Sequence, residues 1–229
     1  MKNKIKSFTY RFLATPLGHI LVLLLPKKAK QLSENRITLI HKNKNSMSVT
    51  ERLMRASLVK NLDKIEDYDT IAEQNRNFWV AKAATDLFSE TEETFQTDFL
   101  PNCTFIFDLL KEEMSDGTTK YDTLVEIGTG NGDVLNYLSS KFQDINRFIG
   151  IDLSQNQIEI NTKKYNDNTK LEFVTADAID WVKQYGHDKT IFVSSRGVLE
   201  YFLEDNLQEF LKDINRLGNT MFVAIEPNG

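Results

Sequence analysis

Apolar and polar positions change in blocks along the second half of the chain, and each block has the length of a strand or a helix. Five short apolar runs predict buried strands, at 123–127, 147–152, 171–175, 190–194 and 220–225. Between them, apolar residues recur three or four positions apart and predict helices, at 133–142, 155–165, 178–185 and 204–217. Repeated strand-helix-strand order predicts an α/β fold with a mostly parallel sheet that helices cover on both faces.

The segment before this region follows a helical pattern throughout. Ser48 or Thr50 can cap a first helix, a second helix fits residues 71–88, and a third can start after Pro101. Asp116-Gly117 then marks a turn. We therefore expect three parts, which are a basic and apolar N-terminal segment at 1–46, a helical cap at 47–118 and an α/β core at 119–229.

Charge separates the N-terminal segment from the rest of the chain. Residues 1–46 carry ten Lys and Arg against one acid, Glu34, so their net charge is +9, whereas the whole chain carries −5. The apolar run at 12–25 has 14 residues, fewer than the roughly 20 that cross a bilayer. Three interpretations stay open: a helix packed on the main body, a peripheral foot on an anionic membrane, and an export signal.

The composition excludes several classes of protein. One cysteine, Cys103, cannot form an internal disulfide, and the three histidines lie at no ligand spacing, so we expect no metal site. The basic residues are not interleaved with stacking aromatic residues, so we expect no nucleic-acid partner.

A loop of three alternating glycines follows the first predicted strand. Gly128, Gly130 and Gly132 let the backbone approach a ligand without an intervening Cβ. Their spacing differs from the Gly-x-Gly-x-x-Gly of dinucleotide enzymes, and the loop lacks the Gly-Lys-Ser/Thr ending of a P-loop. The loop is either part of a site for a nucleotide-like ligand or a tight strand-to-helix turn.

Two carboxylates follow the next two strands. Asp152 ends the second strand, where it can accept hydrogen bonds from two ribose hydroxyls. Asp177 follows the third strand, where it can accept from an exocyclic amine, and Ala178 leaves space for a flat ring. For both acids the alternative role is a helix cap.

Together these features resemble class I S-adenosylmethionine-dependent methyltransferases over residues 121–229. The matching segments occur in order and are LVEIGTGNGDVLNYL, FIGIDLSQNQIEI, LEFVTADAID, FVSSRGVLEYF and FVAIEPNG. The resemblance implies a Rossmann-like sheet that usually has seven strands. Because the sequence stops after the fifth, we expect either a fragment or an apolar edge strand that another chain or the N-terminal segment covers.

The resemblance also implies roles for individual residues. The methionine part of the cofactor S-adenosylmethionine would meet Glu126, Ile127, Gly128, Thr129, Gly130 and Gly132. Its adenosine part would meet Asp152 at the ribose and Leu153, Asp177 and Ala178 at the adenine, and Ser195 and Arg196 would line the pocket. Glu200 and Tyr201 are the catalytic candidates, with Glu226 as a further one, and Tyr68, Phe78 and Trp79 are candidates for a lid or substrate wall.

The expected function is methyl transfer to a small-molecule or lipid-linked acceptor. Ser194-Ser195-Arg196-Gly197 stands where enzymes of this superfamily that methylate planar amino groups often have Asn/Asp-Pro-Pro-Tyr, which disfavours such acceptors. The alternatives are a nicotinamide oxidoreductase, which the loop spacing disfavours, and a non-catalytic adaptor or membrane-associated binding module on the same fold. We expect a cytoplasmic protein, and peripheral attachment to the inner membrane face is compatible with that location.

Overall fold

The computed structural model describes residues 16–34, 48–81, 88 and 94–226. The packing of the backbone divides the chain into two compact units, with the division between Phe78 and Trp79. The predicted boundaries after residues 46 and 118 stay predictions.

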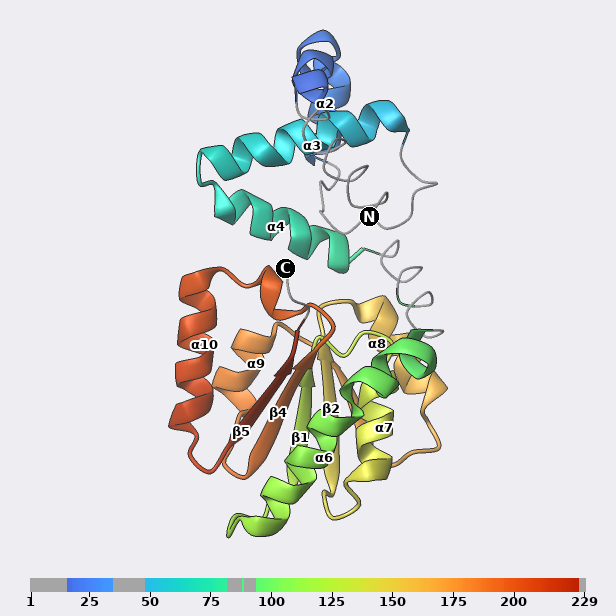
Figure 1. Cartoon of the computed structure of the whole chain (residues 1–229), viewed down its shortest axis with the longest axis vertical. Coiled ribbons are helices and arrows are strands. Elements are labelled where there is room, and N and C mark those ends of the chain that lie inside the picture. Colours follow the sequence, from blue (N-terminus) through green and yellow to red (C-terminus); the bar gives the residue numbers. More distant parts are fainter. Residues whose placement is uncertain (1–15, 35–47, 82–87, 89–93, 227–229) are drawn as a thin grey trace. The chain divides into compact units, whose positions relative to one another are not determined.

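The first unit is helical. Its described elements are a helix at 16–24, α2 (Pro26–Glu34), α3 (Val49–Lys64) and α4 (Tyr68–Trp79; Figure 1), whose last residue, Trp79, belongs to the second unit. Ser48 caps α3 in a capping box, since its hydroxyl accepts from the backbone of Glu51 while the Glu51 carboxylate accepts from the backbone N–H of Ser48 at 2.7 Å. In the described part of the chain, no helix combines the length and the apolar character needed to cross a membrane.

Three of the predicted helix boundaries in the cap were wrong, and the first is the start of α4, which lies at Tyr68 and not at residue 71. Helix α4 ends at Trp79, whereas the apolar spacing predicted a helix to residue 88, of which 82–87 lie outside the described residues. The helix predicted after Pro101 begins earlier, because the π-helix η1 (Phe95–Phe99) runs directly into α6 (Leu100–Asp116). A π-turn there shifts the backbone hydrogen bonds just where Pro101 cannot donate one.

The second unit contains a five-stranded sheet with all neighbours parallel, in the order β3-β2-β1-β4-β5. Its strands are β1 (Thr123–Ile127), β2 (Arg147–Asp152), β3 (Leu171–Thr175), β4 (Thr190–Ser195) and β5 (Met221–Ile225). They alternate with α7 (Asp133–Lys141), α8 (Gln155–Lys164), α9 (Ala178–Tyr185), the 3₁₀-helix η2 (Leu199–Tyr201) and α10 (Glu204–Arg216). The predicted α/β fold is confirmed, and each strand lies within one residue of its predicted bounds.

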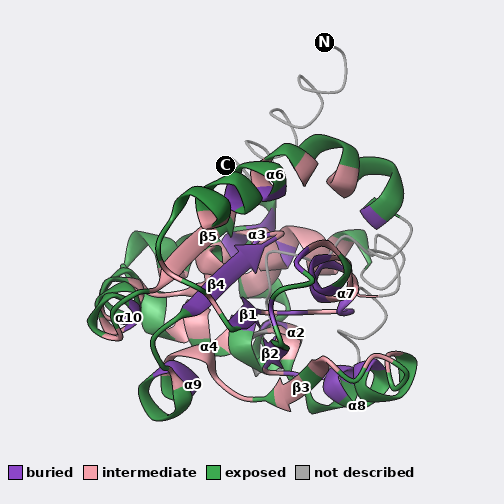
Figure 2. Ribbon diagram, turned by 90° about the horizontal axis from the view of Figure 1, so that it is seen from below, coloured by how far each residue is buried: buried purple, intermediate pink, exposed green. Residues whose placement is uncertain are grey.

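Two apolar cores lie on opposite faces of the sheet. One joins α6 and α7 to the sheet through residues such as Phe107, Leu135 and Phe148, and the other joins α9 and α10 through residues such as Trp181, Phe192 and Phe210. Figure 2 shows the central strands as the buried layer, whereas β3 and β5 at the edges are only partly buried. The burial on both faces explains why the strands read as continuous apolar runs.

Candidate functional site

The carboxyl ends of the parallel strands gather the polar residues that the sequence singled out. Strand order reverses between β1 and β4, and in open α/β sheets ligands bind outside the carboxyl ends at such a switch point. The glycine loop follows β1, Asp152 ends β2 next to it, and Arg196 follows β4 on the other side (Figure 1).

The three loop glycines have left-handed backbone conformations. Their φ angles are +66° at Gly128, +51° at Gly130 and +75° at Gly132. At Gly128 a Cβ would lie 2.6 Å from a methyl carbon of Val198 in the loop after β4. Glycine is therefore required here both by backbone conformation and by the close approach of a neighbouring loop.

Replacing Gly128 by alanine is expected to lower the free energy of unfolding by about 2–4 kcal/mol, since left-handed strain and overpacking add. The matched control is Gly218→Ala, because Gly218 has φ +71° but nothing within 4 Å of a built Cβ. That control should lower the free energy of unfolding by only about 1–2 kcal/mol, because it adds the left-handed strain without overpacking. Urea denaturation of both variants measures the difference, and equal losses would show that Val198 yields without cost.

Both polar groups of the Gly130 peptide unit are held by side chains. The N–H of Gly130 donates to Oδ2 of Asp152 at 2.9 Å, and its carbonyl accepts from Nδ2 of Asn161 at 2.7 Å. Asn161 is fully buried in α8 and its amide oxygen accepts from Gln157 at 2.9 Å. This support fixes the loop before any ligand arrives, and sequence reasoning missed both Asn161 and Gln157 because an interior Asn or Gln on a helix has no distinguishing local pattern.

Asp152 is a buried carboxylate with its oxygens turned to backbone donors. Besides Gly130, the N–H of Ser154 donates to Oδ1 at 2.9 Å, and the side chain is only 7% exposed. Burial raises its pKa, while the backbone hydrogen bonds of Ser154 and Gly130 oppose that rise. The residue that caps α8 is Ser154, whose hydroxyl accepts from the N–H of Gln157, so the cap role considered for Asp152 belongs to its neighbour.

Glu126 is the second buried acid beside the loop. It lies in β1, is 2% exposed and accepts a hydrogen bond from the Thr129 hydroxyl at 2.7 Å. Burial raises its pKa to about 8, and the charge of Asp152 adds to the rise, whereas the bond from Thr129 and the charge of Arg196 oppose it. A carboxyl with such a raised pKa gains or loses its proton when the charges next to it change.

The residues expected around an adenine ring lie at the ends of β2 and β3. Leu153 and Ala178 are half-buried, and Asp177 accepts from the N–H of Ile179 at 2.9 Å, so one of its oxygens caps α9. Its predicted role toward an exocyclic amine stays a prediction.

Arg196 brings a positive charge to the same end of the sheet. Its φ is +67°, its guanidinium donates to the Thr94 hydroxyl at 3.0 Å, and it lies over the Phe99 ring with 5.4 Å to the centroid. Burial lowers its pKa, and the neighbouring acids Asp133 and Glu126 oppose that effect. Ser195, which precedes it, is buried at the end of β4.

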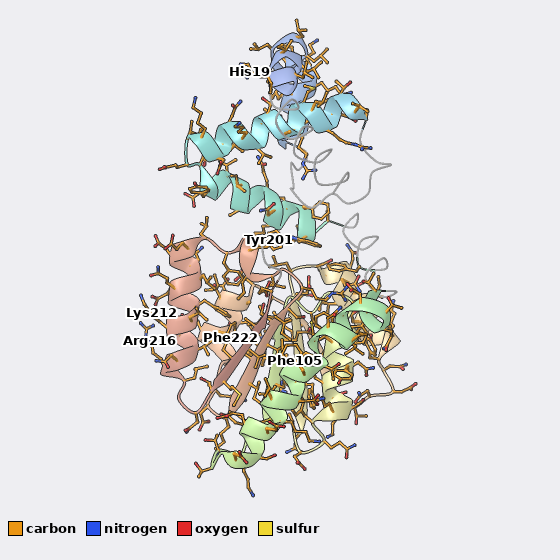
Figure 3. All side chains as sticks on the ribbon, viewed as in Figure 1. His19, Phe105, Tyr201, Lys212, Arg216 and Phe222 are labelled. Carbon is orange, nitrogen blue, oxygen red and sulfur yellow. The ribbon has the colours of Figure 1, made fainter. Side chains whose placement is uncertain are left out.

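An aromatic cluster lies beside the glycine loop and is formed by residues from before and after it in the chain. The ring centroids of Trp79 and Phe88 are 5.4 Å apart, those of Trp79 and Tyr201 are 5.7 Å apart in an edge arrangement, and Phe88 approaches Gly130 closely. Figure 3 shows Tyr201 in η2, at the carboxyl end of the sheet. The structure thus joins the lid candidate Trp79 to the catalytic candidate Tyr201, and adds Phe88, which sequence analysis did not select.

The remaining candidates have simpler surroundings. Tyr68 begins α4 and is half-exposed, and Phe78 is buried near the end of that helix. Glu200 is exposed in η2. The Glu226 carboxylate accepts from the Ser194 hydroxyl and from the N–H of Val198 at 2.9 Å, so it holds the loop after β4 against β5.

Comparison with known proteins finds similarity to methyltransferases. Residues 124–219 match a protein-family model described as a methyltransferase domain. The plantazolicin methyltransferase BpumL, solved with SAH and a pentazolic desmethylPZN analog, has a TM-score of 0.51 and 19% sequence identity over 72% of this chain and 62% of that chain. The structure of BpumL in complex with SAH has a TM-score of 0.50 and 19% sequence identity, and the match covers 75% of this chain and 62% of that chain.

The relation to these structures is one of fold, and it is partial in length. The plantazolicin methyltransferase BamL has a TM-score of 0.48 and 22% identity over 64% of this chain and 53% of that chain. The chain spans about 62% of the length of BpumL. No protein with a curated description matches the chain.

Proposed function

We propose that this chain is a class I S-adenosylmethionine-dependent methyltransferase that binds S-adenosylmethionine at the carboxyl ends of β1 and β2, which the match of residues 124–219 to a methyltransferase-domain model supports. The observation that carries the proposal is the arrangement of Asp152, Gly130 and Glu126 at one end of the sheet, where two buried acids lie beside a loop with three left-handed glycines.

The residues present fit such a cofactor. A carboxylate has about four lone-pair sites, so Asp152 can accept from ribose hydroxyls while keeping its bonds to Gly130 and Ser154. The three glycines give the loop its left-handed backbone conformation, and the side chains of Val198, Phe88 and Tyr165 pack against them. A cationic cofactor bound beside Glu126 would oppose the rise in the pKa of this carboxyl and favour its ionised form, and the Thr129 hydroxyl already donates to one of its oxygens.

When bound, S-adenosylmethionine supplies a methyl group that is already activated by the positive charge on its sulfur. The chain's own residues then have to position the acceptor, align it with the methyl group and exclude water from the site. These effects account for much of the rate enhancement in such a displacement. Trp79 and Phe88 form an apolar cover next to Gly130 that serves to exclude water.

An acceptor of high pKa would also need a base. Burial and the nearby Glu200 raise the pKa of Tyr201 above its ordinary range, so this phenol keeps its proton and acts as a hydrogen-bond donor. Glu226 is engaged by Ser194 and Val198. We therefore assign the proton-accepting role to Glu200, with Tyr201 orienting the acceptor.

The acceptor class that we propose is a small molecule or a lipid-linked group, and a peptide-like molecule such as the desmethylPZN analog in BpumL is the second option. The test is incubation of the full chain with methyl-labelled S-adenosylmethionine and cell extract, followed by organic and aqueous extraction. Label in one fraction, with release of S-adenosylhomocysteine, supports the proposal and identifies the class. Folded chain that binds the cofactor but transfers no label would instead favour the adaptor function.

A further inference from the structure

The helix at 16–24 carries a row of large aliphatic side chains that the described chain leaves exposed. The exposed fractions are 51% for Leu17, 53% for Ile20, 68% for Leu23 and 70% for Leu24. Positions 17, 20 and 24 are three or four apart and lie on one helix face, and Leu23 borders it. A contiguous exposed aliphatic face of this kind marks an interaction site.

The other side of the same helix is already packed. A Cβ built on Gly18 would lie 1.9 Å from the carbonyl oxygen of Leu53 in α3 and 3.0 Å from the Cβ of Ser57. Gly18 thus allows the two helix backbones to touch, and Ser57 is fully buried. The exposed face is therefore what remains after the helix has docked within its own unit.

Basic residues follow the apolar face in the next helix. The first helix ends before Leu25 and α2 begins at Pro26, with the N–H of Leu25 donating to the carbonyl of Leu21 and the N–H of Ala29 donating to the carbonyl of Leu25. Helix α2 then presents Lys27 and Lys30 as exposed side chains. Lys28 in the same helix forms an ion pair with Glu51 at 3.3 Å. The positive charge of residues 1–46, +9 in total, lies in the same part of the sequence.

We propose that this surface, which we call the docking face and define as Leu17, Ile20, Leu23, Leu24, Lys27 and Lys30, binds an anionic lipid bilayer. Short helices with an aliphatic face beside lysines lie in the membrane interface, with the aliphatic side chains below the headgroups and the lysines among lipid phosphates. A second protein surface is the less fitting occupant, because lysine is depleted from protein interfaces. Figure 3 marks this helix by its label on His19, an exposed residue.

The experiment is co-sedimentation of the full chain with vesicles of phosphatidylcholine, either alone or containing about one third phosphatidylglycerol. We expect binding to the phosphatidylglycerol vesicles that weakens about tenfold between low and moderate salt, since lysines contribute through a screened attraction. The double variant Leu23→Ser with Leu24→Ser should bind at least tenfold more weakly, and Lys27→Glu several-fold more weakly.

The matched control is Ile65→Ser, because Ile65 is 68% exposed at the end of α3 and lies outside the docking face. Its vesicle affinity should equal that of the unchanged chain, and circular dichroism should show all variants folded. Absence of binding to anionic vesicles, or an equal loss in the Ile65 variant, would overturn the proposal. A dimer in analytical ultracentrifugation that disappears in the Leu23, Leu24 variant would also overturn it and assign the face to a second copy.

Discussion

Replacing Asp152 by alanine is expected to weaken binding of S-adenosylhomocysteine about 100-fold. In the proposed complex the carboxylate accepts from both ribose hydroxyls, and a hydrogen bond to a charged group contributes about 1.5–3 kcal/mol. Two such bonds exceed the roughly 2.7 kcal/mol that corresponds to 100-fold in affinity. The same carboxylate also accepts from the N–H of Gly130, so its loss loosens the loop as well. Calorimetric titration measures the change.

The control is Glu172→Ala, which removes another acid of the same sheet. Glu172 is a half-exposed residue of β3 that pairs with Arg147 at 2.6 Å, and its removal should leave the affinity unchanged. Asp152→Asn keeps the size of the side chain and guards against a variant that fails to fold. Affinity in a folded Asp152 variant that matches that of the unchanged chain would remove the ribose contact from the account.

The second large effect is a pH dependence of stability that originates at Glu126. The pKa of this buried carboxyl is about 8 in the folded chain, against an ordinary 4.5. Below pH 4.5 it is protonated in both states. As the pH rises from 4.5 to 8 the unfolded state loses the proton while the folded state keeps it, so this group's stabilisation falls. The slope is about 1.4 kcal/mol per pH unit, which gives on the order of 4 kcal/mol between pH 5 and 8.

Glu126→Gln should remove this component. A glutamine keeps an oxygen to accept from the Thr129 hydroxyl and cannot ionise. Urea denaturation of both proteins at pH 5, 6.5 and 8 should therefore show curves that diverge as the pH rises, with the unchanged chain losing more. An infrared band of a protonated carboxylic acid at pH 6, lost at high pH, is the independent readout. Parallel stability profiles would show that Glu126 is ionised in the folded chain at all these values.

The sheet followed from sequence because its strands are buried on both faces. β1, β2 and β3 have the predicted bounds, and the glycines after β1 could be placed at a strand-to-helix turn by spacing alone. The helices of the cap were harder. Apolar spacing does not indicate where α4 ends, and no local sequence pattern predicts the π-helix before Pro101.

The candidate site divides in the same way. Gly130 and Asp152 could be paired from their places at the ends of adjacent strands, and their 2.9 Å hydrogen bond agrees with that pairing. Asn161 and Phe88 could not be found, because they reach Gly130 from 31 residues after it and 42 residues before it in the chain and belong to no motif. Long-range packing decides such contacts.

A crystal structure of the chain with S-adenosylhomocysteine would measure directly where the adenosine part of the cofactor lies. We predict the ligand at the carboxyl ends of β1 and β2, with both ribose hydroxyls within about 2.5–2.9 Å of the Asp152 oxygens. A ligand bound elsewhere, with Asp152 contacting only the N–H groups of Gly130 and Ser154, would contradict the account.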